Sequence, residues 1–279
     1  MSSTSAWSMR AACQSAPVPG YSFWESSGEV EAVGVEETSL EGGAVNEVVR
    51  IGATVRRGPT ERSDYVRDLL ALFERRGWPG APRHLGTDER GRDMFGYIEG
   101  RAAVTAEERA AARTDANLIS VARLVRAFHD LTHGTPSAGD RDVVCHNDLA
   151  PKNTVYDVRG DDWRPLAFVD WDLAAPGERV HDVAHLCWQY LDLGPGLTDV
   201  PEAARRIRLV CDAYGLDERG VLVDTVLWWQ DRCWRGIDAA ADRGEPAMVA
   251  LREAGAVEEV RGAWEWVAGH RRELGALLR

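Results

Sequence analysis

The sequence predicts an α+β protein of two lobes, a small β-rich lobe followed by a larger, mostly helical one. The chain has 279 residues, which is long for one compact domain and suits two lobes. Its first structured part alternates short extended runs with one helix, whereas helical periodicity dominates beyond residue 100. We therefore expect a weakly ordered N-terminal extension over 1–38, a small lobe over 39–100 and a helical lobe over 101–279.

The small lobe is predicted from its turn residues and hydrophobic periods. A glycine pair, Gly42 and Gly43, precedes a β-hairpin over 45–57. A helix over 63–76 follows, and 82–100 contains two further strands around a turn. The predicted order is therefore β-β-α-β-β.

The helical lobe begins with a strongly periodic stretch after Thr105, which is a candidate N-cap. His129 and His133 lie four apart in it, either as a metal pair or as an ordinary helix end against a packed lobe. After residue 176 the chain is predicted to be all-helical, with patterns near 180–192, 201–215, 219–242 and 246–278. Its tryptophans form an aromatic core stripe or line a substrate cleft: Trp188, Trp228, Trp229, Trp234, Trp264 and Trp266.

Composition restricts the classes of partner and compartment. The formal net charge is −12, which argues against a nucleic-acid backbone as a partner and is compatible with a cationic substrate. No apolar run is long enough to span a membrane, and the N-terminus lacks the apolar core of a signal peptide. The five cysteines are scattered and fit free thiols, so we expect a cytoplasmic protein.

The chemistry is concentrated in 143–174, where polar residues follow short β-like runs. Asp148 comes five residues before Asn153, and Asp170 ends the next apolar run, so Asn153 and Asp170 can lie side by side at a hairpin edge. Their oxygens suit Mg²⁺, which takes its other ligands from water and phosphates. Asp148 is placed to accept a proton from a hydroxyl, which together with the metal ligands is the arrangement of phosphoryl transfer. Asp172 is either a substrate or metal group or a loop-bracing carboxylate, and Lys152 is either a phosphate contact or a surface charge.

The order and spacing of these elements resemble a known family. "HNDLAPKN" followed by "FVDWDLA" and "HDVAHL" is similar to the catalytic-loop and metal-ligand pattern of the protein-kinase-like fold, in its aminoglycoside phosphotransferase and choline kinase branch. The resemblance extends over roughly 40–279, and the chain is also similar to bacterial phosphotransferase-family proteins, some of them grouped with trifolitoxin immunity proteins. It implies a bilobal protein-kinase-like fold with a β-rich nucleotide-binding N-lobe and a helical C-lobe that carries the acceptor site.

The resemblance also implies roles for individual residues. Asp148 would be the catalytic base, Asn153 and Asp170 would bind Mg²⁺, and Asp182 would brace the catalytic loop with structural help from His146. The nucleotide would be ATP. Its site would comprise Gly42 and Gly43 over the phosphates, Arg57 beside them, Tyr97 and Ile98 at the adenine hinge, and Val155 and Val169 under the base.

Three departures from the family pattern bear on activity. Position 147 is Asn where the family usually has Gly. The strand lysine that grips the α- and β-phosphates is missing, and Arg56 or Arg57 stands nearest its place; only one of the two can face the nucleotide, because neighbours in a strand point to opposite faces. The helix over 63–76 offers no clear glutamate to pair with that cation.

We therefore expect an ATP- and Mg²⁺-dependent phosphotransferase whose acceptor is a hydroxyl of a small molecule. Aminoglycosides, macrolides, choline-like alcohols, sugars, natural-product intermediates and a peptide Ser or Thr all remain open as acceptors, as does GTP as the nucleotide. The alternative is a kinase-fold binding, accessory or immunity protein with little or no phosphoryl transfer. A metal-dependent hydrolase built on Asp148, Asp170 and Asp172 is a third reading, but it lacks obvious histidine ligands.

Overall fold

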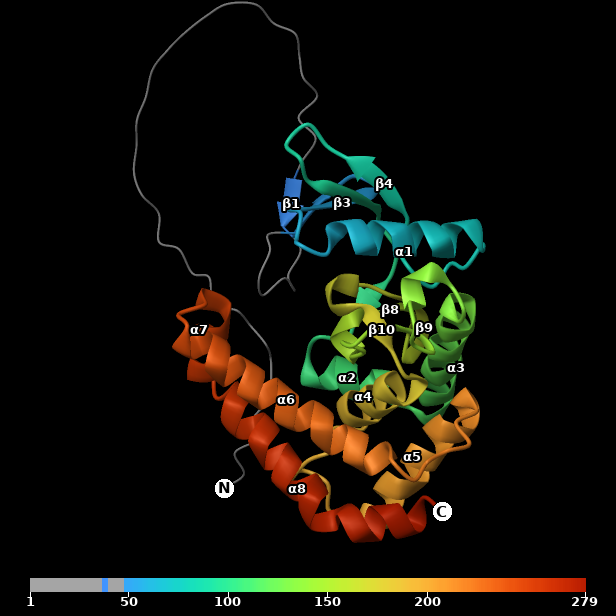
Figure 1. Ribbon diagram of the computed structural model, residues 1–279, viewed down its shortest axis with the longest axis vertical. Coiled ribbons are helices and arrows are strands. Elements are labelled where there is room, and N and C mark those ends of the chain that lie inside the picture. Colours follow the sequence, from blue (N-terminus) through green and yellow to red (C-terminus); the bar gives the residue numbers. More distant parts are fainter. Residues whose placement is uncertain (1–36, 40–47) are drawn as a thin grey trace, which may run out of the picture.

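A computed structural model describes residues 37–39 and 48–279 of the chain (Figure 1). Within these residues a sheet-rich region lies at one end of a mostly helical body, and two long helices form the opposite edge. Gly42 and Gly43 lie outside the described residues. No helix in the described part is both long and apolar enough to cross a bilayer.

The sheet-rich region is built on five antiparallel strands in the order β1-β2-β3-β5-β4. Helix α1 lies beneath this sheet, between it and the body (Figure 1). Its apolar residues recur at helical spacing, and Val66, Leu69, Leu70 and Phe73 are buried. The bounds are β1 Glu37–Ser39, β2 Val48–Ile51, β3 Thr54–Arg57, α1 Ser63–Arg75, β4 His84–Thr87 and β5 Asp93–Gly96.

Helix α1 is joined to the body by aromatic packing and hydrogen bonds. The ring of Phe73 lies 5.1 Å from that of Trp171, which in turn lies 5.2 Å from the ring of Phe128 on α3. The hydroxyl of Tyr65 donates to the carbonyl of Ser137 at 2.9 Å. The helix therefore shares one continuous core with the helical lobe.

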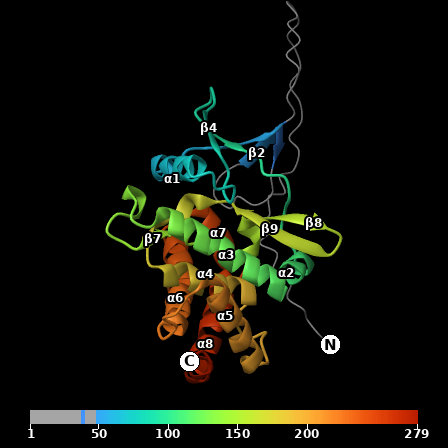
Figure 2. The ribbon, with the colours of Figure 1, turned by 90° about the vertical axis from the view of Figure 1, so that its right-hand side faces the viewer.

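Two small sheets position the polar loops. One has the strand order β6-β8-β9, in which β8 and β9 form a hairpin (Figure 2), and the other pairs β10 with β7. Thr154 at the start of β8 is in register with Phe168 at the end of β9, so the residues flanking this pair meet at one edge of the hairpin. The bounds are β6 Arg101–Ala102, β7 Val143–Cys145, β8 Thr154–Arg159, β9 Asp162–Phe168 and β10 Ala175–Gly177, with short 3-10 turns η1 Pro136–Ala138, η2 Pro151–Asn153 and η3 Trp171–Leu173.

The link between the two regions passes close to β8. Gly100 has φ +150°, and a Cβ there would lie 2.5 Å from the carbonyl oxygen of Tyr156. Only glycine tolerates both the dihedral and this approach.

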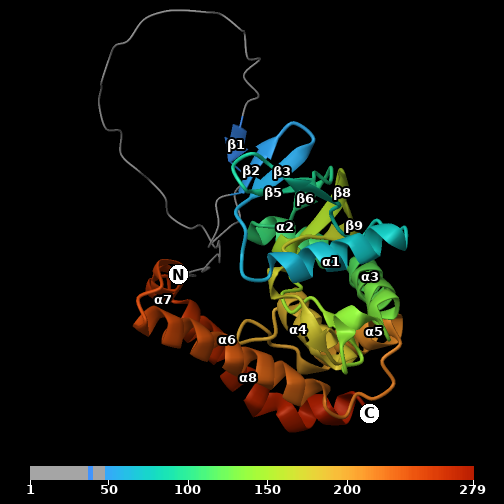
Figure 3. The same cartoon turned by 45° about the horizontal axis from the view of Figure 1, so that its top comes forward.

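The remaining helices form the body. Helices α6 and α8 run side by side along one edge, with α7 at one end (Figure 3). The stretch predicted as helical over 246–278 is two helices, because Gly255 adopts φ +85° and interrupts it. Thr105 caps α2 in a capping box with Glu108. The bounds are α2 Ala106–Ala112, α3 Asp115–Thr132, α4 Arg179–Leu191, α5 Val200–Tyr214, α6 Leu222–Asp242, α7 Pro246–Glu253 and α8 Ala256–Leu277.

Candidate active site

The loop between β7 and β8 brings together the residues predicted to carry the chemistry. The side-chain amide of Asn153 donates to the carboxylate of Asp148 at 2.7 Å and to its carbonyl at 2.9 Å. The ammonium of Lys152 lies 3.2 Å from the same carboxylate and 3.4 Å from the Asn153 Oδ1 atom. Asn153 is 5% exposed, whereas the Asp148 side chain is partly open to solvent. A carboxylate, an amide oxygen and a cation therefore converge at one point.

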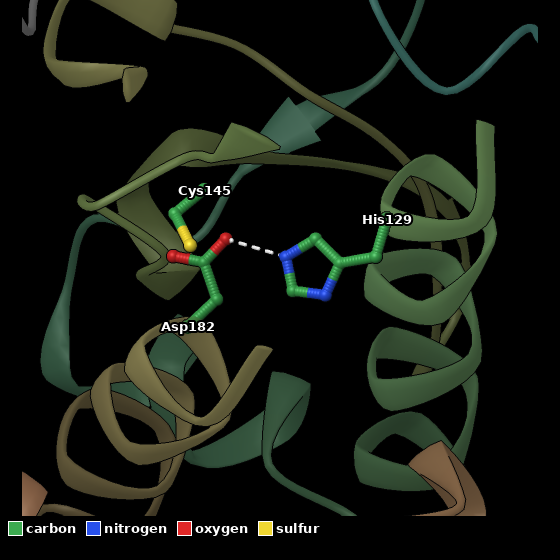
Figure 4. Close-up of side chains that lie close together, drawn as sticks. All are labelled: His129, Cys145 and Asp182. Carbon is green, nitrogen blue, oxygen red and sulfur yellow. Dashed lines mark hydrogen bonds and ion pairs between the residues drawn. The ribbon is translucent and has the colours of Figure 1, made fainter. Parts of the chain in front are cut away.

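The loop is held from below by the carboxylate of Asp182, near the start of α4 (Figure 4). One carboxylate oxygen accepts from the backbone N–H of His146 at 2.7 Å and the other from that of Asn147 at 2.9 Å. Asp182 is 0% exposed and also accepts from His129 Nε2 at 3.1 Å. Burial alone would raise the pKa of Asp182, but the hydrogen bond and charge of His129 outweigh it, and the pKa lies below its usual value. The side chain therefore braces the loop as a carboxylate.

The hydrogen bonds that hold Asp182 continue into α3 and α5. Because the Asp182 carboxylate only accepts, His129 donates to it from Nε2, and the Nδ1 atom of the same ring contacts the hydroxyl of Tyr214 at 2.7 Å. Arg179 donates in turn to that hydroxyl at 3.3 Å. His129 therefore orients the Asp182 carboxylate. His133 instead contacts Asp142 at 2.8 Å, so the two histidines do not form the metal pair that their spacing allowed.

His129, Cys145 and Asp182 form one compact group whose potential ligand atoms lie within 4.8 Å of one another (Figure 4). All three side chains are fully buried, and Asp182 already accepts three hydrogen bonds. Burial raises the pKa of Cys145 well above its ordinary value, and the charge of Asp182 adds to this effect. A protonated thiol in a hydrogen-bonded core is a poor metal ligand, so the group is better explained as structure.

His146 packs against Trp171 and hydrogen-bonds to the backbone of the loop, which is the arrangement expected of a supporting residue. Its Nε2 atom contacts the carbonyl of Val169 at 3.1 Å, its Nδ1 atom accepts from the Asp148 N–H at 3.3 Å, and its ring lies 4.5 Å from that of Trp171. Burial lowers the pKa of His146, so the ring is neutral at pH 7. The loop geometry therefore does not depend on a charged imidazole.

The segment after β9 presents two carboxylates to the sheet-rich region. Asp170 has φ +64° and its side chain is 45% exposed. Asp172 is more enclosed: burial raises its pKa, the charge of Arg57 opposes the rise and that of Asp170 adds to it. Arg57 lies 2.6 Å from the Asp172 carboxylate and 3.6 Å from that of Asp170. The side chain of Arg57 on β3 therefore forms ion pairs with the body.

The two arginines of β3 have different surroundings. Arg56 Nε lies 3.6 Å from the Asp88 carboxylate in the turn between β4 and β5, and Arg56 also donates to Thr54. Arg57 points to the body, and its buried Nε has no hydrogen-bond partner among the described residues. The structure therefore directs Arg57, and not Arg56, toward Asp170.

Helix α1 does not supply a carboxylate to Arg57. The reverse pairing occurs next to it: Arg67 on α1 donates to the buried carboxylate of Asp93 on β5 at 2.7 Å. Asp93 also contacts His84 at 3.1 Å and lies opposite Arg57 in the strand register. This pairing was not predicted, because its partners are 26 residues apart and neither belongs to a motif.

The residues predicted to surround the base lie on β8, just after β9 and in the link after β5. Val155 is 8% exposed on β8, and the Val169 N–H donates to the Asn153 carbonyl at 2.9 Å. Tyr97 and Ile98 lie in the link after β5, where the Tyr97 N–H donates to the Ala53 carbonyl at 2.9 Å. That N–H is therefore committed to the backbone of the sheet-rich region.

Helix α6 passes beside the loop. Burial raises the pKa of Cys233 to about 11, with a further rise from the charge of Asp148 and an opposing effect from Lys152. The thiol therefore lies within electrostatic range of the loop. Sequence reasoning did not single out Cys233, because nothing local connects it to the motif.

These features agree with comparisons to known proteins. Residues 52–208, more than half of the chain, match the model of the phosphotransferase enzyme family (APH). The chain belongs to this family. It is 27% identical to the trifolitoxin immunity protein of Rhizobium leguminosarum bv. trifolii over 273 residues, which covers 87% of this chain and 99% of that protein.

Solved structures agree on the fold. A choline/ethanolamine kinase family protein from Mesorhizobium loti has a TM-score of 0.59 at 16% identity, covering 89% of this chain and 94% of that one. The GDP complex of aminoglycoside 2'-phosphotransferase-IIIa gives 0.59 at 12% identity, with 87% and 95% covered. Choline kinase from Cryptosporidium parvum gives 0.60 at 12%, with 90% and 93% covered. The predicted protein-kinase-like fold is confirmed, and the family supports a kinase-type enzyme.

Proposed function

We propose that this protein is an ATP- and Mg²⁺-dependent phosphotransferase that moves the γ-phosphoryl group to a hydroxyl of a small molecule. The observation that carries the proposal is the contact between Asp148 and Asn153 on a loop braced by buried Asp182. Asp148 accepts the proton of the acceptor hydroxyl and orients it for attack. Positioning and electrostatic stabilisation supply most of the rate in such reactions.

The donor set fits a magnesium ion. Asn153 Oδ1 has only the Lys152 ammonium, at 3.4 Å, as a polar side-chain contact in the described part, and the exposed carboxylate of Asp170 is near the same edge. Hard oxygen donors in such a small number suit Mg²⁺, because its other ligands are water and phosphate. When bound, the ion would neutralise charge on the phosphate oxygens.

Arg57 is the residue that we assign to the nucleotide phosphates. Its buried Nε is a donor without a partner in the described residues, which a phosphate oxygen would satisfy. Its guanidinium would leave the Asp170 and Asp172 carboxylates for the phosphates, and the Asp170 carboxylate would then be available to the ion. Ile98, Val155 and Val169 would line the base.

The charges on α6 leave the class of acceptor open. Every aspartate of this helix forms an ion pair with an arginine: Asp224 with Arg271, Asp231 with Arg235, and both Asp238 and Asp242 with Arg252. All four carboxylates are at least 38% exposed, so solvent screens these pairs and a cationic acceptor could replace the arginines at little cost. An aminoglycoside and an uncharged natural-product alcohol are therefore both candidates. We expect the reaction in the cytoplasm, where the free thiols of the described part stay reduced.

The first experiment is calorimetric titration with ATP and, separately, GTP, each with and without Mg²⁺, on the wild type and on Asp170→Ala. The proposal expects binding that depends on Mg²⁺ and weakens at least tenfold in the variant. An acceptor screen follows, in which Asp148→Ala should abolish transfer and keep nucleotide affinity. If the protein binds neither nucleotide under any of these conditions, the proposal is refuted.

A second candidate is a kinase-fold binding or immunity protein with little transfer. Two observations favour it: the similarity to a trifolitoxin immunity protein over nearly its whole length, and the absence of a carboxylate from α1 at Arg57. The two candidates differ at Asp148. In a binding protein, Asp148→Ala should leave protection against a toxin intact, whereas in an enzyme it should abolish it.

A further inference from the structure

The chain contains a single lysine, at position 152, among its 33 lysine and arginine residues. All the other residues of this set are arginine. The two cations are not equivalent, because arginine is a broad planar fork whereas lysine is a compact point charge with three donors on a flexible stem. The one exception in this chain lies in the catalytic loop, four residues after Asp148.

The surroundings of Lys152 hold its ammonium at a defined place. Its neighbours in the turn η2, Pro151 and Asn153, are both buried, so the backbone is anchored. The ammonium lies 3.2 Å from the Asp148 carboxylate and 3.4 Å from Asn153 Oδ1, and the side chain is 37% exposed. The cation thus sits between the oxygen assigned to the acceptor proton and the oxygen assigned to the metal.

We propose that Lys152 is a further catalytic residue of this site, a cation that binds the γ-phosphoryl group during transfer. The inference rests on the proposed phosphotransferase function. Arg57 approaches from the sheet-rich region and pairs with Asp170 and Asp172, whereas Lys152 approaches from the body and pairs with Asp148. The two cations therefore serve different parts of the phosphate chain, with Arg57 on the α- and β-phosphates and Lys152 on the γ-phosphoryl.

The step balances without any further reactant. The acceptor oxygen forms a bond to the γ-phosphorus, and the bond from that phosphorus to the β–γ bridging oxygen breaks. The bridging oxygen keeps the electron pair and leaves with the nucleoside diphosphate, while the acceptor proton passes to Asp148. Lys152 stays protonated throughout and donates to non-bridging oxygens of the γ-phosphoryl, where charge is spread in the transition state.

A surface charge that merely neutralises Asp148 is the competing explanation. Both explanations place the ammonium near the carboxylate in the free protein. They differ when nucleotide is bound, because only a lysine that binds the γ-phosphoryl group would move its ammonium toward the γ-phosphate. They differ again in kinetics, since a transition-state contact lowers kcat with little change in nucleotide affinity.

The single lysine makes a direct test possible. Full-length protein without a lysine-containing tag, produced with lysine ¹³C-labelled at Cε, gives one NMR signal, which reports Lys152 alone. We expect the Mg²⁺ complex of the β,γ-imido analogue of ATP to shift this signal clearly more than MgADP does. Equal shifts with the two nucleotides, or no shift despite binding in the calorimeter, would overturn the role of Lys152 and leave the proposed function standing. Absence of nucleotide binding would overturn both.

Kinetics provide a second readout. ATP hydrolysis in the absence of acceptor, which is transfer to water, should fall about 10²-fold in Lys152→Met, with nucleotide affinity unchanged within about threefold. Lys152→Arg keeps the charge and should recover part of the rate. The control is Arg159→Met, which removes a cation that is 82% exposed on β8 and should leave the rate unchanged. A fall in Lys152→Met no larger than in this control would refute the catalytic role.

Discussion

Asp182 is the residue whose alteration should disturb the loop between β7 and β8 most, because its fully buried carboxylate accepts three hydrogen bonds. An Asp182→Asn change keeps the size of the side chain but replaces one acceptor oxygen with an NH₂ group. The amide can turn so that its oxygen keeps the donors of His146 and His129, and the N–H of Asn147 then faces another donor. One orphaned buried donor costs about 1–3 kcal/mol. The two remaining bonds lose their charge, at roughly 1 kcal/mol each, so the total loss should be about 3–5 kcal/mol.

The measurement is the free energy of unfolding in urea at pH 7.5, compared between wild type and variant. The control is Asp130→Asn on α3, where a half-exposed carboxylate pairs with Arg126 and Arg179. Because solvent screens that pair, its loss should be below about 1 kcal/mol. If Asp182→Asn loses no more than the control, the carboxylate does not hold the loop and the reasoning is refuted.

Three further predictions concern acidity, phosphate binding and the link. Burial lowers the pKa of both His146 and His185, so their contribution to stability is complete above about pH 6.5 and is lost as the pH falls below it. Unfolding should therefore take less free energy at pH 5.5 than at pH 7.5, by up to about 3 kcal/mol for the two groups, and His185→Gln should reduce this difference, whereas a flat profile would contradict it. Arg57→Met should weaken MgATP binding about tenfold by calorimetry, whereas Arg56→Met, on the opposite face of β3, should leave it unchanged; equal effects would contradict the assignment. Gly100→Ala should cost about 2 kcal/mol or more in urea unfolding, because its Cβ would meet the β8 backbone; a loss below about 0.5 kcal/mol would mean that the link adjusts freely.

The parts of the site that the sequence predicted are those whose members are close in the chain. Asp148 and Asn153 are five residues apart, and a short loop anchored by the turn η2 leaves them little freedom to separate. The edge shared by Asn153 and Asp170 also followed from a hairpin, in which one register sets both positions. Local spacing was sufficient in both cases.

The parts that escaped prediction depend on contacts between distant segments. The choice between Arg56 and Arg57 needed the strand register, because a shift of one residue exchanges the two faces. His129 lies 53 residues from Asp182, and its hydrogen bond depends on the packing of α3 against α4. The break at Gly255 was missed because the apolar period continues on both sides of it.

The docking of α1 has a mechanical consequence. The helix belongs to the sheet-rich region by sequence, yet Phe73 packs on Trp171, and Tyr65 is bonded to Ser137 in the body. Trp171 directly follows Asp170, so α1 and the carboxylate assigned to the metal form one rigid unit. Arg67 of the same helix also donates to the buried carboxylate of Asp93 on β5, so α1 links the strands to this unit. A movement of the sheet alone over a nucleotide would have to break that ion pair, and the sheet and α1 would therefore move together.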